Sequence, residues 1–212
     1  MTIKGVLFDF DGTLTLPGAL DFPAIKKALG CPLDQPILEF LETQPPDLRD
    51  KLEKVLEEEE DRAAQASLPN RGAEKCLSAL RKRQISIGIL TRNSLKSVKK
   101  ALERFKVVTI DAFDTIVTRE VSLPKPHPDG VIKAAGQMGL SPEELLVVGD
   151  FRFDVIAGKR AGAMAVLLTN GGESGMAPDD PQPDYTISRL EDLPALLSQP
   201  TQPRETARVQ IS

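Results

Sequence analysis

The chain has 212 residues, of which 41% are hydrophobic and 27% charged, and its formal net charge is −4. This length suits one large domain, alone or with a modest insertion, and the acidic balance gives no basic footprint for nucleic acid or an anionic membrane. No apolar stretch approaches a bilayer span, the N-terminus lacks a signal-peptide pattern, and the two cysteines, Cys31 and Cys76, fit a reducing compartment. We therefore expect a cytoplasmic globular protein that binds neither nucleic acid nor membranes, as a monomer or a dimer.

The first predicted strand, residues 3–8 (IKGVLF), ends in two carboxylates, Asp9 and Asp11, followed at once by Gly12. Side chains two positions apart on an extended chain point to the same side, so both carboxylates should face one spot. Two like charges held together at the end of a buried strand are costly unless a divalent metal or a shared proton compensates them. A simple turn at Asp11-Gly12 would not explain Asp9, and the pair therefore predicts a functional site.

The next segment, residues 15–70, contains no strand-like run and predicts a small helical insertion after the first strand. Turn-forming residues at 17–18 (PG) and 69–72 (PNRG) bracket it like two hinges. The acidic run at residues 57–61 (EEEED) is interpreted as a solvated helix face. The helical patterns cover residues 22–29, 37–41 and 46–66.

The second predicted strand, residues 85–90, ends at Thr91. A hydroxyl and free backbone amides just before a helix make a natural phosphate site, because a helix N-terminus carries positive partial charge. The alternative is that Asn93 or Ser94 simply caps that helix. The flanking helices are predicted from apolar faces formed by Ala73, Cys76, Leu77 and Leu80 before the strand, and by Leu95, Val98, Leu102 and Phe105 after it.

Lys125 lies in residues 124–128 (PKPHP), where three prolines restrict the path of the backbone. A lysine held in this way can balance both a phosphate and a carboxylate nucleophile, although the segment alone also fits a stiff loop with an exposed lysine. His127 is the only histidine of the chain. Without a second histidine or a paired Ser or Cys nucleophile it is interpreted as structural, which argues against triad hydrolases and His-rich zinc sites.

The third predicted strand, residues 145–148, is followed by Asp150 and Asp154. Asp150 at the strand end would bring a further carboxylate to the pair Asp9 and Asp11. Hard oxygen ligands with open positions favour Mg²⁺ over zinc. Asp154 lies in the first turn of the next helix, where it is either a helix-terminal charge or a neighbour of the metal ligands rather than a ligand itself.

The remaining pattern completes an alternation of strands and helices. A helix with Val131, Ala135 and Met138 on one face and a capped turn at residues 141–144 precede the third strand. A fourth strand is predicted at residues 165–168, and residues 199–212 are expected to form a loose tail. Continuous apolar strands alternating with helices predict an α/β fold with a Rossmann-like, doubly wound parallel sheet, whose ligands bind beyond the carboxyl ends of the strands.

The four motifs around Asp9, Thr91, Lys125 and Asp150, in this order, resemble the signature motifs of the haloacid dehalogenase (HAD) superfamily of phosphotransferases. The resemblance covers about residues 3–14 and 71–197, and the helical insertion resembles the small cap of phosphoglycolate phosphatase-like members. It implies a catalytic core of residues 1–14 and 71–198, a cap of residues 15–70 and a tail of residues 199–212.

The resemblance also implies roles for the site residues. Asp9 would be the nucleophile, and Asp11 would be the general acid that protonates the leaving alcohol and then the base that activates water. Mg²⁺ would be held by Asp9, by Asp150 and by the main-chain carbonyl of Asp11. Four further residues would bind the phosphate or orient the cluster: Phe10, Thr91 and Lys125 for the phosphate, and Asp154 for the orientation.

Arg92 departs from the commonest family pattern, in which a small or amide residue follows the threonine. It either points into solvent or offers a fork to a carboxylate or a second phosphate of the substrate. Arg71 at the hinge is a weaker candidate for the same task.

The expected function is that of a Mg²⁺-dependent phosphatase for a small phosphorylated metabolite, with phosphoglycolate-like esters among the candidates. A sugar phosphomutase of the same superfamily is the alternative, because it uses the same nucleophile but returns the phosphate to the substrate. Dehalogenation is disfavoured, since it needs neither the acid at position 11 nor a metal. A non-catalytic binding or regulatory module is a third reading, although every catalytic position is filled.

Overall fold

The computed structural model of the chain describes residues 2–197. Its centre is a six-stranded sheet in the order β3-β2-β1-β4-β5-β6, in which every neighbouring pair is parallel. The strands are β1 (Gly5–Phe8), β2 (Ser86–Leu90), β3 (Thr115–Val117), β4 (Leu145–Gly149), β5 (Met164–Leu168) and β6 (Tyr185–Ile187). The chain runs from β1 outwards to β3 and then returns to the other side of β1 with β4, so β1 and β4 flank the point where the strand order reverses.

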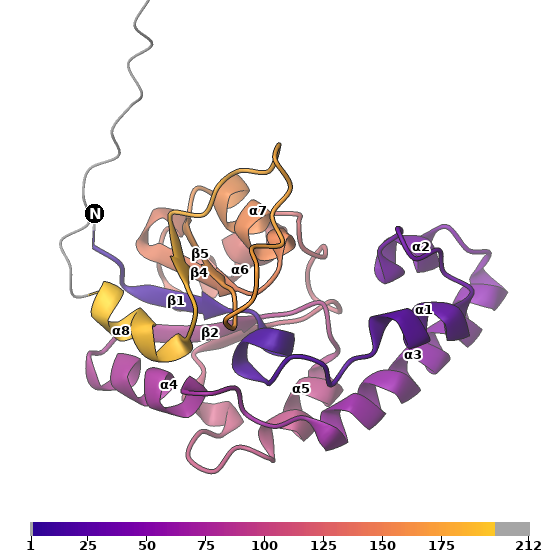
Figure 1. Cartoon of the computed structure of the whole chain (residues 1–212), viewed down its shortest axis with the longest axis horizontal. Coiled ribbons are helices and arrows are strands. Elements are labelled where there is room, and N and C mark those ends of the chain that lie inside the picture. The colour runs from indigo at the N-terminus through magenta and orange to yellow at the C-terminus, as the bar shows by residue number, and fades with distance from the viewer. Residues whose placement is uncertain (1, 198–212) are drawn as a thin grey trace, which may run out of the picture.

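Helices cover both faces of this sheet (Figure 1). They are α4 (Ala73–Lys82), α5 (Leu95–Leu102), α6 (Asp129–Met138), α7 (Arg152–Ala161) and the short α8 (Leu193–Leu196). Alternate residues of β1 point to opposite faces: Val6 and Phe8 pack with α4 and α5, whereas Leu7 packs with α6 and α7. Burial on both faces explains why the central strands are continuous apolar runs, and it confirms the predicted doubly wound α/β fold.

The segment between β1 and β2 contains three helices, α1 (Phe22–Leu29), α2 (Ile37–Glu42) and α3 (Pro46–Ala66). They lie to one side of the sheet, beyond the end to which β1 points (Figure 1), and they share an apolar cluster of their own. The two connections that join them to the sheet run side by side, because Thr15 and Pro69 form an antiparallel bridge and the Leu16 N–H donates to the Leu68 carbonyl at 2.9 Å. The long helix α3 also packs against α5.

The sequence-based prediction missed two strands, β3 and β6. Each has only three residues and forms an edge of the sheet, so neither leaves a long apolar run. The predicted apolar face of α5 is also corrected: Leu95 is 38% exposed, and Phe105 is buried but lies beyond the end of the helix. The predicted tail at residues 199–212 lies outside the described residues. Among the helices of residues 2–197, none combines the length and the apolar character that a membrane span requires.

Candidate active site

The carboxyl ends of β2, β1 and β4 lie next to one another and bring the separate motifs together. Phe8 pairs with Ile89 on one side and with Val148 on the other. The residues that follow these three strands therefore emerge together at the edge of the sheet formed by the carboxyl ends of its strands. The Asp9 N–H continues the ladder by donating to the Val148 carbonyl at 2.8 Å. Asp9, Thr91 and Asp150 therefore start from adjacent strand ends, as the doubly wound fold requires.

Lys125 is buried at this edge rather than exposed in a stiff loop. Its three ammonium donors reach Asp9 Oδ1 at 2.5 Å, Asp154 Oδ1 at 2.6 Å and the Leu90 carbonyl at 2.9 Å. Burial alone would lower the pKa of Lys125, but the charges of Asp154 and Asp9 outweigh it and hold the pKa above its usual value. The lysine is therefore a fixed cation that touches the proposed nucleophile.

Three carboxylates form a compact acidic cluster. One oxygen from each of Asp9, Asp150 and Asp154 lies within 4.8 Å of the others. Burial is the main cause that raises the pKa of Asp9 to about 7, and the charges of Asp154 and Asp11 add to it while Lys125 opposes it. Burial followed by the charge of Asp9 raises the pKa of Asp150 to about 8. The cluster thus holds more negative charge than Lys125 balances.

The turn after β1 is shaped by close approach to Asp150. Gly12 has a φ of +83°, and a Cβ there would lie 2.2 Å from Asp150 Oδ2, so both the conformation and the space call for glycine. The Thr13 hydroxyl donates to Asp150 Oδ1 at 3.4 Å. Two amide side chains hold the turn from outside, because Asn170 Nδ2 donates to the Gly12 carbonyl and Asn70 Nδ2 to the Thr13 carbonyl, each at 2.8 Å. The ring of Phe10 is buried in the core, which leaves its backbone for the site.

Asp11 is half-buried and is bound by Asn93, whose Nδ2 donates to Asp11 Oδ2 at 3.1 Å. Burial raises the pKa of Asp11 to about 6, while the hydrogen bond from Asn93 limits the rise. Thr91 Oγ1 accepts the Asn93 N–H at 3.0 Å, so the hydroxyl lies in the same loop. Ser94, not Asn93, caps α5, since its side chain accepts from the Ser97 N–H. Of the two capping residues that the sequence offered, Ser94 is the one that caps α5, and the side-chain amide of Asn93 binds Asp11 instead.

Asp154 lies between the lysine and the backbone of the loop after β4. Its Oδ1 accepts from Lys125, and its Oδ2 accepts the Phe151 N–H at 3.1 Å. A Cβ at Gly149 would lie 2.1 Å from Asp154 Cγ, so the absence of a side chain there lets the carboxylate reach the cluster. Both oxygens are thus committed to protein donors, which suits an orienting residue.

Arg92 does not extend freely into solvent. Its guanidinium binds Glu39 of α2 with two hydrogen bonds, Nη1 to Oε1 at 3.0 Å and Nη2 to Oε2 at 2.6 Å. It also donates to the Lys125 carbonyl and lies over the ring of Phe153, 5.4 Å from its centroid. Arg71 is exposed, and its recorded hydrogen bond is made by its backbone N–H to Asn70. The fork of Arg92 is therefore filled by a carboxylate of the chain itself.

The interpretation of residues 57–61 as a solvated face is wrong for Glu60. Glu60 is only 5% exposed and pairs with the guanidinium of Arg119. Leu56, Glu60 and Ala64 follow one another at helical spacing on the buried side of α3, and this places one acidic residue of the run inward. Burial raises the pKa of Glu60, although the hydrogen bond and charge of Arg119 oppose the rise.

Several residues near the site escaped the sequence-based prediction. Asn93 follows Thr91 by two positions at a strand end, a spacing that could have pointed to it. The others lack such a signal, because isolated polar residues in loops or helices gain a role only through contacts distant in sequence: Asn70, Asn170, Glu39, Glu60 and Arg119.

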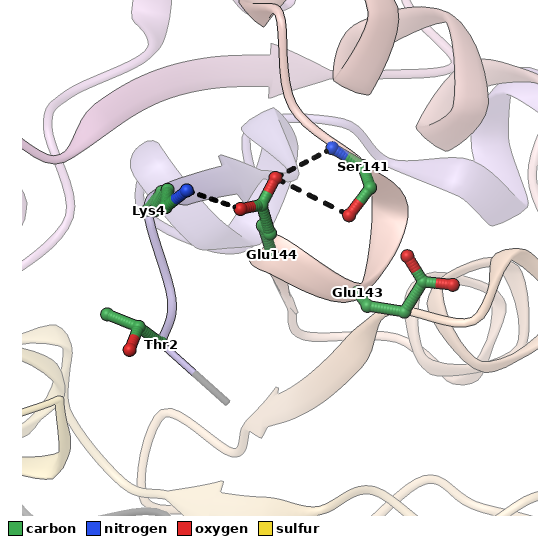
Figure 2. Close-up of a pocket in the computed structure, with 5 residues that line it drawn as sticks. All are labelled: Thr2, Lys4, Ser141, Glu143 and Glu144. Carbon is green, nitrogen blue, oxygen red and sulfur yellow. Dashed lines mark hydrogen bonds and ion pairs between the residues drawn. The ribbon is translucent and has the colours of Figure 1, made fainter.

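A separate hollow of about 630 Å³ lies at the opposite, amino end of the strands (Figure 2). Within it, the Glu144 carboxylate binds Lys4 at 2.6 Å and the Ser141 N–H at 3.0 Å. These contacts close the turn before β4, as the predicted capped turn requires. The polar groups are thereby explained by local structure, and the chemistry-bearing residues lie at the other edge.

A family model described as haloacid dehalogenase-like hydrolase matches residues 17–168, more than half of the 212 residues. The chain belongs to this family. It is a haloacid dehalogenase-like hydrolase, and the resemblance drawn from the four motifs is confirmed. The matched range begins beyond the turn that carries Asp9, so the position of that turn comes from the structure.

Relatives cover most of the chain. A Saccharomyces cerevisiae protein described as an uncharacterised hydrolase is 37% identical over an alignment of 176 residues. The alignment covers 79% of this chain and 78% of the Saccharomyces cerevisiae protein. A haloacid dehalogenase-like hydrolase domain-containing protein of Arabidopsis thaliana is 32% identical over 92% of this chain and 84% of its own. The phosphoglycolate phosphatase of Escherichia coli is 36% identical, but over only 57% of this chain and 48% of its own.

Solved structures share the fold at low identity. A hydrolase from Pseudomonas syringae has a TM-score of 0.76 at 23% identity and covers 92% of this chain and 98% of its own. An L-2-haloacid dehalogenase from Xanthobacter autotrophicus has a TM-score of 0.68 at 20% identity. The match covers 93% of this chain and 99% of the dehalogenase. Since a dehalogenase and other hydrolases share this fold, the reaction has to be argued from the site residues.

Proposed function

We propose that this hydrolase is a Mg²⁺-dependent phosphatase that removes the phosphate from a small phosphorylated metabolite by way of a phosphoryl group on Asp9. One observation carries the proposal. Two aspartates only two positions apart have different partners: Asp9 touches the ammonium of Lys125, whereas Asp11 touches the neutral amide of Asn93. Burial raises the pKa of Asp9 to about 7, so we expect Asp9 to attack as an anion when Lys125 and a bound cation together favour its charged form. The partner of Asp11 is neutral, which leaves that carboxyl able to carry a proton.

The acidic cluster fits Mg²⁺. Its donors are all oxygens, they lie within 4.8 Å of one another, and burial raises the pKa of both Asp9 and Asp150. A divalent cation would supply the missing positive charge and would offset the charge of a bound phosphate. We assign its ligands to Asp9, Asp150 and the main-chain carbonyl of Asp11, with Asp154 orienting the cluster.

The chain's own residues then divide the work. Asp9 attacks phosphorus, while Lys125 favours its charged form against the effect of burial and neutralises part of the phosphate charge. Thr91 and the backbone amide of Phe10 donate hydrogen bonds to phosphate oxygens. Asp11, with its pKa raised by burial to about 6, hands a proton to the leaving alcohol and then takes one from the water that hydrolyses phosphoryl-Asp9.

We propose that residues 15–70 act as a cap that covers this edge of the sheet. The paired connections at Thr15 and Pro69 form a narrow joint, and the three helices have their own apolar cluster. A compact cap suits a small substrate that is enclosed while the leaving group departs. Cys31 and Cys76 are both buried and neither forms a disulfide, which supports the proposal of a cytoplasmic setting.

The experiment is a phosphate-release screen over small phosphoesters with Mg²⁺, run beside the Asp9→Asn variant. We expect release by the wild type and a loss of about a thousandfold or more in the variant, because it lacks the nucleophile. Equal release by both proteins would contradict the mechanism. An isomerised ester formed without steady phosphate release would instead indicate a phosphomutase.

A further inference from the structure

Two helices of the proposed cap, α2 and α3, each place a glutamate against an arginine that lies in or next to the loop after β2. Arg92, in that loop, binds both oxygens of Glu39. Arg119, whose Nη1 also reaches the Arg92 carbonyl at 3.5 Å, binds Glu60. An anionic group on a substrate would therefore have to displace a carboxylate of the chain before either arginine could bind it.

Glu60 has an unused acceptor. Only its Oε1 is bound by Arg119, and within residues 2–197 its buried Oε2 has no hydrogen-bond partner. The whole residue is 5% exposed. A buried carboxylate oxygen without a donor is costly, and buried polar atoms of this kind are rare in folded proteins. A hydrogen-bond donor on a ligand would satisfy it.

A short chain of contacts connects Glu60 to the proton-carrying residue of the site. Arg119, the partner of Glu60, donates its backbone N–H to the Asn93 carbonyl at 3.4 Å, and Asn93 binds Asp11. Three contacts, Glu60–Arg119, Arg119–Asn93 and Asn93–Asp11, therefore connect Glu60 to the residue that would protonate the leaving alcohol.

We propose that the leaving alcohol of the substrate carries a hydrogen-bond donor, a hydroxyl or an ammonium group, that binds the free oxygen of Glu60, and that it carries no second anionic group. This inference rests on the phosphatase function proposed above and names its substrate class. Polyol phosphates and amino-alcohol phosphates meet the requirement. Phosphoglycolate does not, because its carboxylate would approach Glu60 and Glu39 and find both arginines taken.

The wild-type protein gives the first test. Three esters of similar size are compared with Mg²⁺: glycerol 3-phosphate with hydroxyl donors, phosphoethanolamine with an ammonium donor, and phosphoglycolate with a carboxylate. We expect kcat/KM for one of the first two to exceed that for phosphoglycolate by at least about tenfold, because a hydrogen bond to a charged acceptor is replaced by repulsion. The first two esters distinguish a hydroxyl from an ammonium donor.

The Glu60→Gln variant gives the second test. It nearly preserves the shape of the side chain but removes its charge, which weakens its hold on Arg119 and replaces one of its two acceptor oxygens by an amide nitrogen. We expect the ratio of kcat/KM for the preferred donor ester to that for phosphoglycolate to fall by about tenfold. The matched control is Asp61→Asn on the next position of α3, whose carboxylate pairs with Lys100 at 2.7 Å and which should leave the ratio unchanged.

Two results would overturn the inference: phosphoglycolate as the best of the three esters for the wild type, or an unchanged ratio in Glu60→Gln. A merely structural effect of the substitution would lower all three rates in proportion and give the second of these results. If phosphate release still depends on Asp9, either result would contradict the inference about the substrate but not the proposed phosphatase function. If no small ester lost phosphate in an Asp9-dependent way, the proposed function would fail and the inference with it.

Discussion

Asp9 and Asp11 differ in what surrounds each carboxylate, although only Phe10 separates them. Asp9 is held by a buried ammonium and shares the acidic cluster, whereas Asp11 is half-buried and accepts a hydrogen bond from Asn93. The pKa of Asp11 is raised by burial to about 6, close to the pH at which a proton carrier works best. The pKa of Asp9 is raised by burial to about 7, so its proposed role as nucleophile depends on Lys125 and a bound cation, both supplied by contacts far away in the sequence.

The role of Asp11 predicts a dependence on the leaving group. In Asp11→Asn, kcat for an alkyl phosphate should fall by about 10² to 10⁴, because the alcohol leaves without a proton. For 4-nitrophenyl phosphate, whose phenolate leaves unaided, rapid-mixing absorbance should show a burst of about one nitrophenolate per enzyme. A slow steady rate should follow it, since water is no longer activated. Equal losses for both esters in the first turnover would show that Asp11 does not act as the acid.

At the scale of elements, ion pairs connect helices α2 and α3 to loops that follow the strands of the sheet. The Glu39–Arg92 pair joins α2 to the loop after β2, and the Glu60–Arg119 pair joins α3 to the loop after β3. Lys100 of α5 adds a contact to Asp61 at 2.7 Å. Charged contacts thus add to the packing of α3 against α5, and a change of pH can weaken them.

The Glu39–Arg92 pair predicts a pH-dependent contribution to stability. Burial alone would raise the pKa of Glu39, but the hydrogen bonds and charge of Arg92 outweigh it and lower the pKa below 4.5. The pair should therefore stabilise the fold fully above about pH 5 and lose this effect as the pH falls through the lowered pKa. In Glu39→Gln, thermal unfolding should show a loss of about 1 kcal/mol at pH 7 and a much smaller loss near pH 3.5.

Glu42→Gln is the matched control, because Glu42 lies at the end of the same helix with its side chain exposed. It should leave the unfolding temperature nearly unchanged at both pH values. A loss for Glu39→Gln that is equal at pH 7 and pH 3.5 would show that packing, not the ion pair, is what the substitution removes.

The elements that the sequence predicted well are those with strong periodic or continuous apolar signals. The helix at residues 46–66 and the central strands β1, β2 and β4 were predicted within a few residues, because burial dictates their composition. The edge strands β3 and β6 were missed, since three residues half-covered by neighbours need no apolar run. Glu60 was misread because a charge run states nothing about which of its members faces inward.

The convergence of the site was predictable where its residues stand at strand ends, whereas Lys125 was predicted from its proline-rich segment and from the family resemblance. Asp9, Thr91 and Asp150 follow apolar runs, so their convergence follows from the parallel order of the sheet. The sequence offered no comparable signal for Asn70 or Asn170, which fix the turn through contacts that only the folded chain creates. Long-range contacts of this kind carry no local pattern, and they account for most of what was missed.

At the scale of the whole molecule, the sheet gathers acidic side chains at one edge, and we propose that a bound cation balances them. We expect Mg²⁺ to raise the unfolding temperature, with a gain of about 2.7 kcal/mol when free Mg²⁺ reaches a hundred times its dissociation constant. Differential scanning fluorimetry with Mg²⁺ and with a chelator measures the gain. It should be abolished in Asp150→Asn and retained in Asp179→Asn, an exposed acidic residue outside the cluster.

The most direct test of the central claim is whether phosphate becomes covalently attached to Asp9 during turnover. A radiolabelled ester that the screen has identified is mixed with the protein and Mg²⁺, quenched in acid within the first turnovers, and the digested peptides are separated. We expect label on the peptide that contains Asp9 and none in the Asp9→Asn variant. Steady phosphate release by the wild type without label on that peptide would contradict the central claim.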